Sequence, residues 1–182
     1  MFNMEQKSIF IEGVWRVFEI FVEEPLNLHF IKQISKKINL APTSVKLHLK
    51  KLEEKNIVIK KKGDRFFGYV ANRDNEDFLF YKKMFNMIKI KESKIIDYIK
   101  NTIYPKTIVL YGSYSRSEDI EKSDIDLLII SKTKKILELE KFEKILKRKI
   151  HIIIKKQFSA LNNPMQTEIR NGIVLYGYLE DE

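Results

Sequence analysis

The chain has 182 residues, a net charge of +9 and no cysteine. Its length accommodates one large domain or two small ones, and the lack of cysteine excludes disulfides and thiolate metal sites. The sequence contains no run of about 18 apolar residues that would predict a membrane span. The first ten residues lack the pattern of a signal peptide. We therefore expect a soluble, cytoplasmic protein.

The positive charge is concentrated in one segment of the first half. Residues 29–65 contain eleven Lys and Arg side chains against three acidic ones, a net charge of +8. A surplus packed into so short a segment indicates an anionic partner. Lysine is common along the whole chain, and a solvated lysine-rich face is the alternative interpretation.

The first two predicted elements are helices. Residues 8–22 are apolar on nearly every side, which predicts a buried helix that ends before Pro25. A short apolar stripe that includes Ile31 and Ile34 predicts a second helix, and residues 39–42 interrupt it.

A third helix and a hairpin follow. Pro42 suits the first turn of the helix, and Val45, Leu49 and Leu52 recur at the spacing of an inward face. Residues 57–70 then alternate as two strands around a Lys-Lys-Gly-Asp turn.

The outward side of the third helix and the hairpin carry polar and basic side chains that suit DNA. A helix about 10 Å wide enters the major groove, where such side chains reach phosphates and base edges. A basic hairpin tip lies along the neighbouring backbone. The residues that we expect to contact DNA are Thr43, Ser44, Lys46, His48, Lys50, Lys51, Lys60, Lys61, Lys62 and Arg65.

The stretch APTSVKLHLKKLEEKNIVIKKKGDRFFGY resembles the recognition helix and wing of the ArsR-like winged-helix regulators. The resemblance covers roughly residues 8–73 and implies a winged helix-turn-helix domain, which we assign to residues 1–76, that binds duplex DNA in transcription regulation. Winged helices also serve as protein-binding modules, so this alternative stays open.

Residues 77–100 contain no Gly or Pro and have a helical pattern. The polar run 91–93 interrupts the apolar face, which predicts two helices or one bent helix, and we assign residues 77–90 to a linking helix. Its aromatic side chains fit either a homodimer interface or packing between this chain's own two domains.

The stretch YGSYSRSEDIEKSDIDLLII, residues 111–130, places a Gly-Ser turn after one apolar strand and two aspartates at the start of the next. Alternation along the second strand puts Asp124 and Asp126 on one face. Two neighbouring carboxylates repel unless a divalent cation with oxygen ligands lies between them. The turn at Gly112 and Ser113 offers backbone N–H groups that suit a phosphate. Together these features predict a site for a nucleoside triphosphate with Mg²⁺.

The same stretch is similar to the Gly-Ser, spacer, Asp-x-Asp signature of the DNA polymerase beta-like nucleotidyltransferases, and it resembles their minimal prokaryotic domains most. The resemblance spans roughly residues 91–178, and we assign the domain to residues 91–182. It implies that the nucleotide contacts Gly112, Ser113, Arg116 and Ser123, and that the catalytic pair Asp124 and Asp126 binds Mg²⁺ as the cofactor.

The chain departs from that family at one position. Family members with full activity carry a third carboxylate on the next strand. Here a helix predicted over residues 134–148 precedes the run RKIHIIIKK, and His151 stands at the expected position. His151 is consistent with a weakened transferase that still binds nucleotide, with transfer that uses two acids and a histidine base, or with an ordinary half-buried strand residue.

The whole pattern predicts an α+β protein with a winged helix-turn-helix domain followed by a small mixed-sheet α/β domain that ends in a strand at residues 173–178. Three functions are compatible with it. The chain is a DNA-binding regulator linked to nucleotide, a nucleotidyltransferase with a targeting module, or an inactive, antitoxin-like protein that binds a toxin-like partner.

Overall fold

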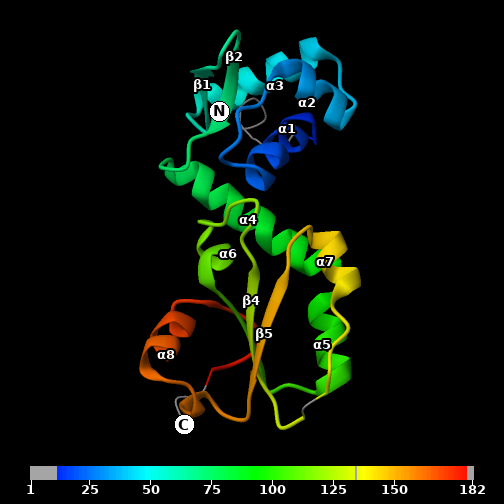
Figure 1. The fold of residues 1–182 in the computed structure, drawn as a ribbon, viewed down its shortest axis with the longest axis vertical. Coiled ribbons are helices and arrows are strands. Elements are labelled where there is room, and N and C mark those ends of the chain that lie inside the picture. Colours follow the sequence, from blue (N-terminus) through cyan, green and yellow to red (C-terminus); the bar gives the residue numbers. More distant parts are fainter. Residues whose placement is uncertain (1–11, 134, 180–182) are drawn as a thin grey trace, which may run out of the picture. The chain divides into compact units, whose positions relative to one another are not determined.

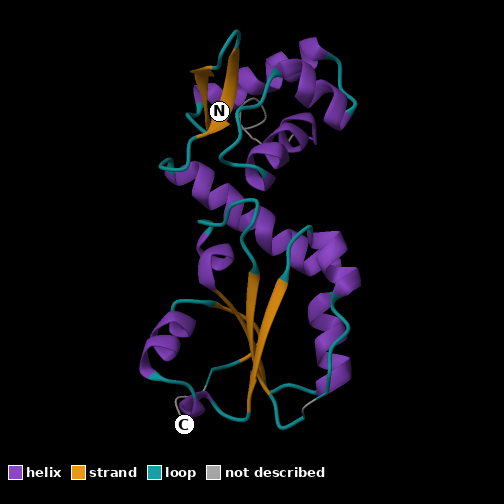
Figure 2. Cartoon of the chain, in the orientation of Figure 1, coloured by secondary structure: helices purple, strands orange, loops and turns teal. Residues whose placement is uncertain are grey.

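The computed structural model describes residues 12–133 and 135–179. The chain separates into two compact units, residues 1–82 and 83–182, and each unit is described by itself. Helices and strands occur in both (Figure 1, Figure 2). No helix in the described part of the chain combines the length and the apolar character that a bilayer crossing requires.

The first unit is built on three helices. They are α1 (Glu12–Glu23), α2 (Ile31–Ile38) and α3 (Pro42–Glu54). Helix α1 packs against α3 through buried residues that include Val17 and Phe18 on α1 and Val45 and Leu49 on α3. The predicted inward face of the third helix is therefore confirmed. Residues 8–11 of the helix predicted at 8–22 lie outside the described residues.

An antiparallel hairpin follows the helices. Strand β1 (Val58–Lys62) pairs with β2 (Phe67–Ala71), with Val58 opposite Ala71 and Lys62 opposite Phe67. His29 adds an isolated bridge to Tyr69. The hairpin is anchored at the Val58 end, where Val58 and Ala71 are buried, while every residue from 59 to 62 is exposed.

Helix α4 (Glu76–Ser93) is longer than the linking helix predicted at 77–90, and α5 (Ile95–Ile103) follows it. Lys94 lies between the two helices with φ of 63°, in the left-handed region. The expectation of a break near residues 91–93 is thus confirmed as two helices separated by one residue.

The second unit contains a four-stranded mixed sheet. Its strands are β3 (Thr107–Tyr111), β4 (Ile125–Ile130), β5 (Ile150–Lys155) and β6 (Ile173–Gly177), in the order β5-β4-β3-β6. Strands β4 and β5 are parallel, and the other neighbours are antiparallel. The predicted small mixed sheet is confirmed.

Helices cover both faces of this sheet (Figure 1). One face packs on α5 and on α7 (Glu140–Leu146), around buried residues that include Ile99, Leu127 and Phe142. The other face packs on a 3-10 helix (Phe158–Ala160) and on α8 (Asn163–Arg170). Side chains that alternate along each strand therefore serve two different cores.

The helix predicted over 134–148 is wrong in its start and in part of its inward face. Helix α7 begins only at Glu140, and residues 135–139 have no regular structure. Ile136 is 96% exposed and Ile145 is 55% exposed. Leu137 and Leu139 of the segment before α7 are half-buried and pack on the core of this sheet. They do so without regular structure, and the helix begins only at Glu140, ahead of the buried Phe142 and Leu146.

Candidate functional site

The turn that joins β3 to the short helix α6 (Gly112–Arg116) is built around Gly112. Its φ of +73° lies in the left-handed region, which glycine adopts without steric cost. A Cβ at this position would lie 2.5 Å from Oδ2 of Asp126. Two residues that the sequence singled out are thus in direct contact, and the missing side chain makes room for the carboxylate.

Asp126 lies in a row across three strands. It pairs with Tyr111 on β3 and with His151 on β5. Nδ1 of His151 is 3.3 Å from Oδ1 of Asp126, and the His151 side chain is 60% exposed. The imidazole therefore stands at the place expected for the third acid and faces the second aspartate with one nitrogen.

The surroundings of Asp126 disfavour its negative charge. Burial raises the pKa of this carboxyl above its usual value, and the charges of Asp124 and Glu168 act in the same direction, while the hydrogen bond and charge of His151 oppose them. Burial, with the charges of Asp126 and Glu168, also raises the pKa of Tyr111 to about 12. A cation bound here would relieve this repulsion.

Asp124 is exposed and lies immediately before β4, one residue short of the strand predicted to contain it. Within the described residues, no group of three or more Asp, Glu or His side chains is placed to hold a metal ion. Two carboxylates still fit Mg²⁺, because this ion is commonly bound by one or two carboxylates together with substrate phosphates. The residues therefore fit a Mg²⁺ ion that arrives with a nucleotide.

The other predicted nucleotide contacts lie on α6 and in the loop before β4. Ser113 follows Gly112 and is half-buried. Ser123 accepts a hydrogen bond at Oγ from the backbone N–H of Ile120, at 3.0 Å. Arg116 is exposed, and its Nε donates to Oε2 of Glu118 at 2.9 Å.

Arg116 also connects α6 to α8. Its Nη1 lies 3.7 Å from Oε1 of Glu168, and these partners raise the pKa of the guanidinium, the hydrogen bond to Glu118 most of all. Arg116 must exchange an acidic partner for a phosphate if it is to bind a triphosphate.

Sequence reasoning missed Tyr111 and Glu168. The sequence pattern indicated only that Tyr111 is the last apolar residue of a strand, although it directly precedes the Gly-Ser turn. Glu168 gave no signal, since it is an acidic residue on a polar helix, and only the packing of α8 against β3 brings its charge near Asp126.

A cavity of about 500 Å³ lies beside Asp124. The loop 121–124 forms one side, and residues of α7 and of the turn before β5 form the other. Its lining mixes charges of both signs: Glu121, Lys122, Asp124, Glu140, Glu143, Lys144, Lys147, Arg148 and Lys149. The charged ends of these side chains can contact polar groups of a ligand, while their aliphatic parts line the rest of the cavity.

The comparisons with known proteins agree with this geometry. The family described as polymerase beta, nucleotidyltransferase, matches residues 93–181. A protein of Methanocaldococcus jannaschii, whose name makes it a candidate protein adenylyltransferase, is 38% identical over 81 residues, which cover 41% of this chain and 75% of that relative. The chain belongs to the polymerase beta nucleotidyltransferase family.

Membership of the nucleotidyltransferase family rests on the second unit. The matched segment contains the Gly112 turn, both aspartates, His151 and Glu168. The match begins after most of α4, so residues 1–92 lie outside it. The first unit must therefore be understood from its own surface.

That surface carries most of the predicted DNA contacts. On α3, Thr43, Lys46 and Lys50 are exposed, while Ser44 and Lys51 are half-buried. On the hairpin, the four predicted basic residues are all exposed: Lys60, Lys61, Lys62 and Arg65.

His48 departs from the expectation of an outward side chain. A Cβ on Gly13 of α1 would lie 2.3 Å from its Nε2, so the half-buried imidazole packs on α1 at a glycine. Position 48 lies one turn from Val45, on the flank of the inward face. Burial, together with the charge of Lys51, lowers the pKa of His48. A neutral, half-buried ring is poorly placed to contact a phosphate.

Proposed function

We propose that the second unit transfers a nucleotidyl group from a nucleoside triphosphate to a hydroxyl group. The observation that carries the proposal is the contact of the Asp126 carboxylate with the glycine turn at Gly112. It brings a carboxylate suited to a cation and a turn suited to a phosphate to one point, as the reaction requires. The family match supports the same reaction class.

Each residue has a distinct task in this proposal. Gly112 and Ser113 receive the triphosphate at a turn that has no obstructing Cβ at its first position. Asp124 and Asp126 hold Mg²⁺, which would neutralise charge on the triphosphate. Arg116 leaves Glu168 or Glu118 to contact a phosphate oxygen.

The acceptor oxygen attacks the α-phosphorus, the bond from that phosphorus to the bridging oxygen of the β-phosphate breaks, and pyrophosphate leaves with the bonding electrons. The acceptor proton passes to a base, for which His151 is our candidate, because it lies beside Asp126 and its side chain is largely exposed. We place the acceptor in the cavity beside Asp124, whose lining residues carry charges of both signs.

A protein hydroxyl is the acceptor class that we propose, and the name of the Methanocaldococcus relative supports it. The test is transfer of label from α-labelled ATP to protein acceptors, with Mg²⁺ and with Mn²⁺. Label should appear with the wild type and vanish with Asp124→Asn. No transfer to a broad acceptor panel with either metal would refute the activity.

The alternative is a catalytically inactive domain that binds a partner, as an antitoxin-like protein would. The observation in its favour is His151, which adds no negative charge for Mg²⁺ at the third acid's place. Retained Mg²⁺-dependent ATP binding without any label transfer would support this alternative.

We further propose that residues 1–76 form a winged helix-turn-helix domain that binds duplex DNA, with α4 as the link to a transferase domain at 91–182. The order α2, α3, hairpin and the exposed lysines on α3 and on the hairpin support it. Affinity for duplex DNA should fall steeply as salt rises, because bound lysines release counterions from the phosphates. An affinity that barely changes would mean that these lysines touch no phosphate.

A further inference from the structure

The hairpin of the first unit exposes apolar rings where its outer end turns. Phe66 is 72% exposed and Phe67 is 60% exposed, whereas Phe18, Phe21 and Phe78 of the same unit are fully buried. Each of these two neighbouring residues leaves most of a large apolar side chain in water, and exposed apolar side chains close together mark a contact surface more often than a single one does.

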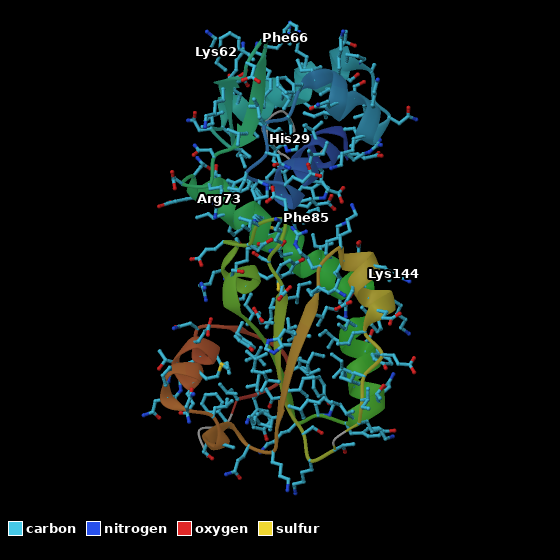
Figure 3. The ribbon with its side chains drawn as sticks, in the orientation of Figure 1. His29, Lys62, Phe66, Arg73, Phe85 and Lys144 are labelled. Carbon is cyan, nitrogen blue, oxygen red and sulfur yellow. The ribbon has the colours of Figure 1, made fainter. Side chains whose placement is uncertain are left out.

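Basic side chains surround these rings. Lys62 lies directly opposite Phe67 in the hairpin register, and Arg65 precedes Phe66 in the chain. The Nζ of Lys60 lies 5.1 Å from the centre of the Phe67 ring. Figure 3 shows Phe66 and Lys62 near the end of the hairpin. Only Asp64 adds a negative charge between residues 59 and 67.

We propose that the hairpin end, residues 59–67, binds unpaired nucleobases of single-stranded nucleic acid. A phenyl ring makes no hydrogen bond to the edge of a base, so it stabilises binding by stacking on the face of a base. In a regular duplex those faces are already stacked on one another. Rings interleaved with Lys and Arg match a strand in which bases alternate with phosphates. The inference rests on the nucleic-acid role proposed above, and it specifies that the hairpin end binds single-stranded nucleic acid.

Other occupants fit this surface less well. A second copy of the chain would bring two lysine-rich hairpins together, and like charges repel. An anionic membrane would take the rings into its apolar region, but Lys62 and Arg65 lie at the level of the rings and would have to follow them at a cost. A single strand accepts rings and charges side by side.

The test uses the full chain and labelled oligonucleotides of about 20 nucleotides, DNA and RNA, single-stranded and duplex, followed by fluorescence anisotropy. The wild type should bind single strands at least as tightly as duplexes. Phe66→Ala with Phe67→Ala should weaken single-strand binding about tenfold or more, because stacked bases are lost. The slope of affinity against salt should stay unchanged, because no charge is removed.

Three matched variants make the result specific. Phe80→Ala removes a ring that is 59% exposed on α4, outside the hairpin, and should leave affinity unchanged. Phe66→Tyr with Phe67→Tyr keeps two rings and should bind as the wild type does. Lys61→Ala with Lys62→Ala should reduce the slope of log affinity against log salt concentration by the contribution of about two phosphate contacts.

The outcomes separate this inference from the proposed function. Duplex binding that is tighter than single-strand binding and insensitive to the double Phe→Ala change would overturn the inference and leave the duplex proposal standing. No binding to any oligonucleotide would overturn both. Binding to phosphatidylserine vesicles that needs both rings, without single-strand binding, would assign the surface to membranes instead.

Discussion

Replacing Gly112 by alanine tests whether the glycine turn and Asp126 work as one site. Gly112 has φ of +73°, so alanine there strains the backbone by about 1–2 kcal/mol. The new Cβ would start 2.5 Å from Oδ2 of Asp126, whereas ordinary contact begins at 3.4 Å, so the carboxylate must move by about 0.9 Å. A displacement of about 1 Å at a reacting centre costs on the order of 100-fold in rate.

Gly177 supplies the matched control. Its φ is +71°, and a Cβ there would lie 2.0 Å from the carbonyl oxygen of Lys106. Gly177→Ala should therefore destabilise the unit at least as much as Gly112→Ala does. It lies at the end of β6, away from the Asp126 row, so it should leave ligand affinity of the folded protein unchanged.

Urea unfolding gives the stability of both variants, calorimetry with ATP and Mg²⁺ gives their affinity, and label transfer gives their rate. We expect Gly112→Ala to lose transfer by about 100-fold with a stability loss no larger than that of Gly177→Ala. Wild-type transfer by Gly112→Ala would refute the reasoning. Equal loss of nucleotide affinity in both variants would trace the effect to general destabilisation.

Three further predictions concern other residues. His151→Asp restores a third acid and should raise the rate of label transfer about tenfold or more. His151→Ala adds no acid and should not raise that rate. An unchanged rate in His151→Asp would show that the histidine does not limit catalysis. Asp119 is 1% exposed beside Arg148, at 3.9 Å, so Asp119→Ala should lower the free energy of unfolding by about 3 kcal/mol in urea denaturation, and a loss below about 1 kcal/mol would contradict a buried pair. The hydrogen bond from Lys37 is the main cause that lowers the pKa of Glu24 below 4.5, so its stabilising contribution is complete above pH 4.5 and is lost as pH falls through the lowered pKa. Glu24→Gln should flatten that part of the stability curve, and an identical pH dependence in both proteins would contradict the pairing.

The local parts of the site follow from sequence. Gly112 and Asp126 stand at the end of one strand and the start of the next, and antiparallel pairing of these strands places Asp126 opposite Tyr111. Parallel pairing of β5 with β4 places His151 opposite Asp126. The sequence carries this much because each strand, and the turn after β3, is defined by residues that are close together in the chain.

Long-range packing decides what the sequence left open. The pattern of α8 does not indicate that Glu168 reaches Arg116 on α6, because that contact depends on how the helix crosses the sheet. His48 is similar, since a polar residue on the flank of an inward face turns inward only where the facing helix offers a glycine, here Gly13. The apolar pattern also does not fix the start of α7, because Leu137 and Leu139 pack on the core before the helix begins, while Ile136 is exposed.

The central claim is that Asp124 and Asp126 hold a Mg²⁺ ion that carries a nucleotide at the Gly112 turn. Calorimetric titration of ATP, with and without Mg²⁺, into the wild type and into Asp126→Asn tests it most directly. Heat of binding should appear only for the wild type with Mg²⁺. Equal ATP binding by Asp126→Asn, or binding that ignores Mg²⁺, would contradict the claim.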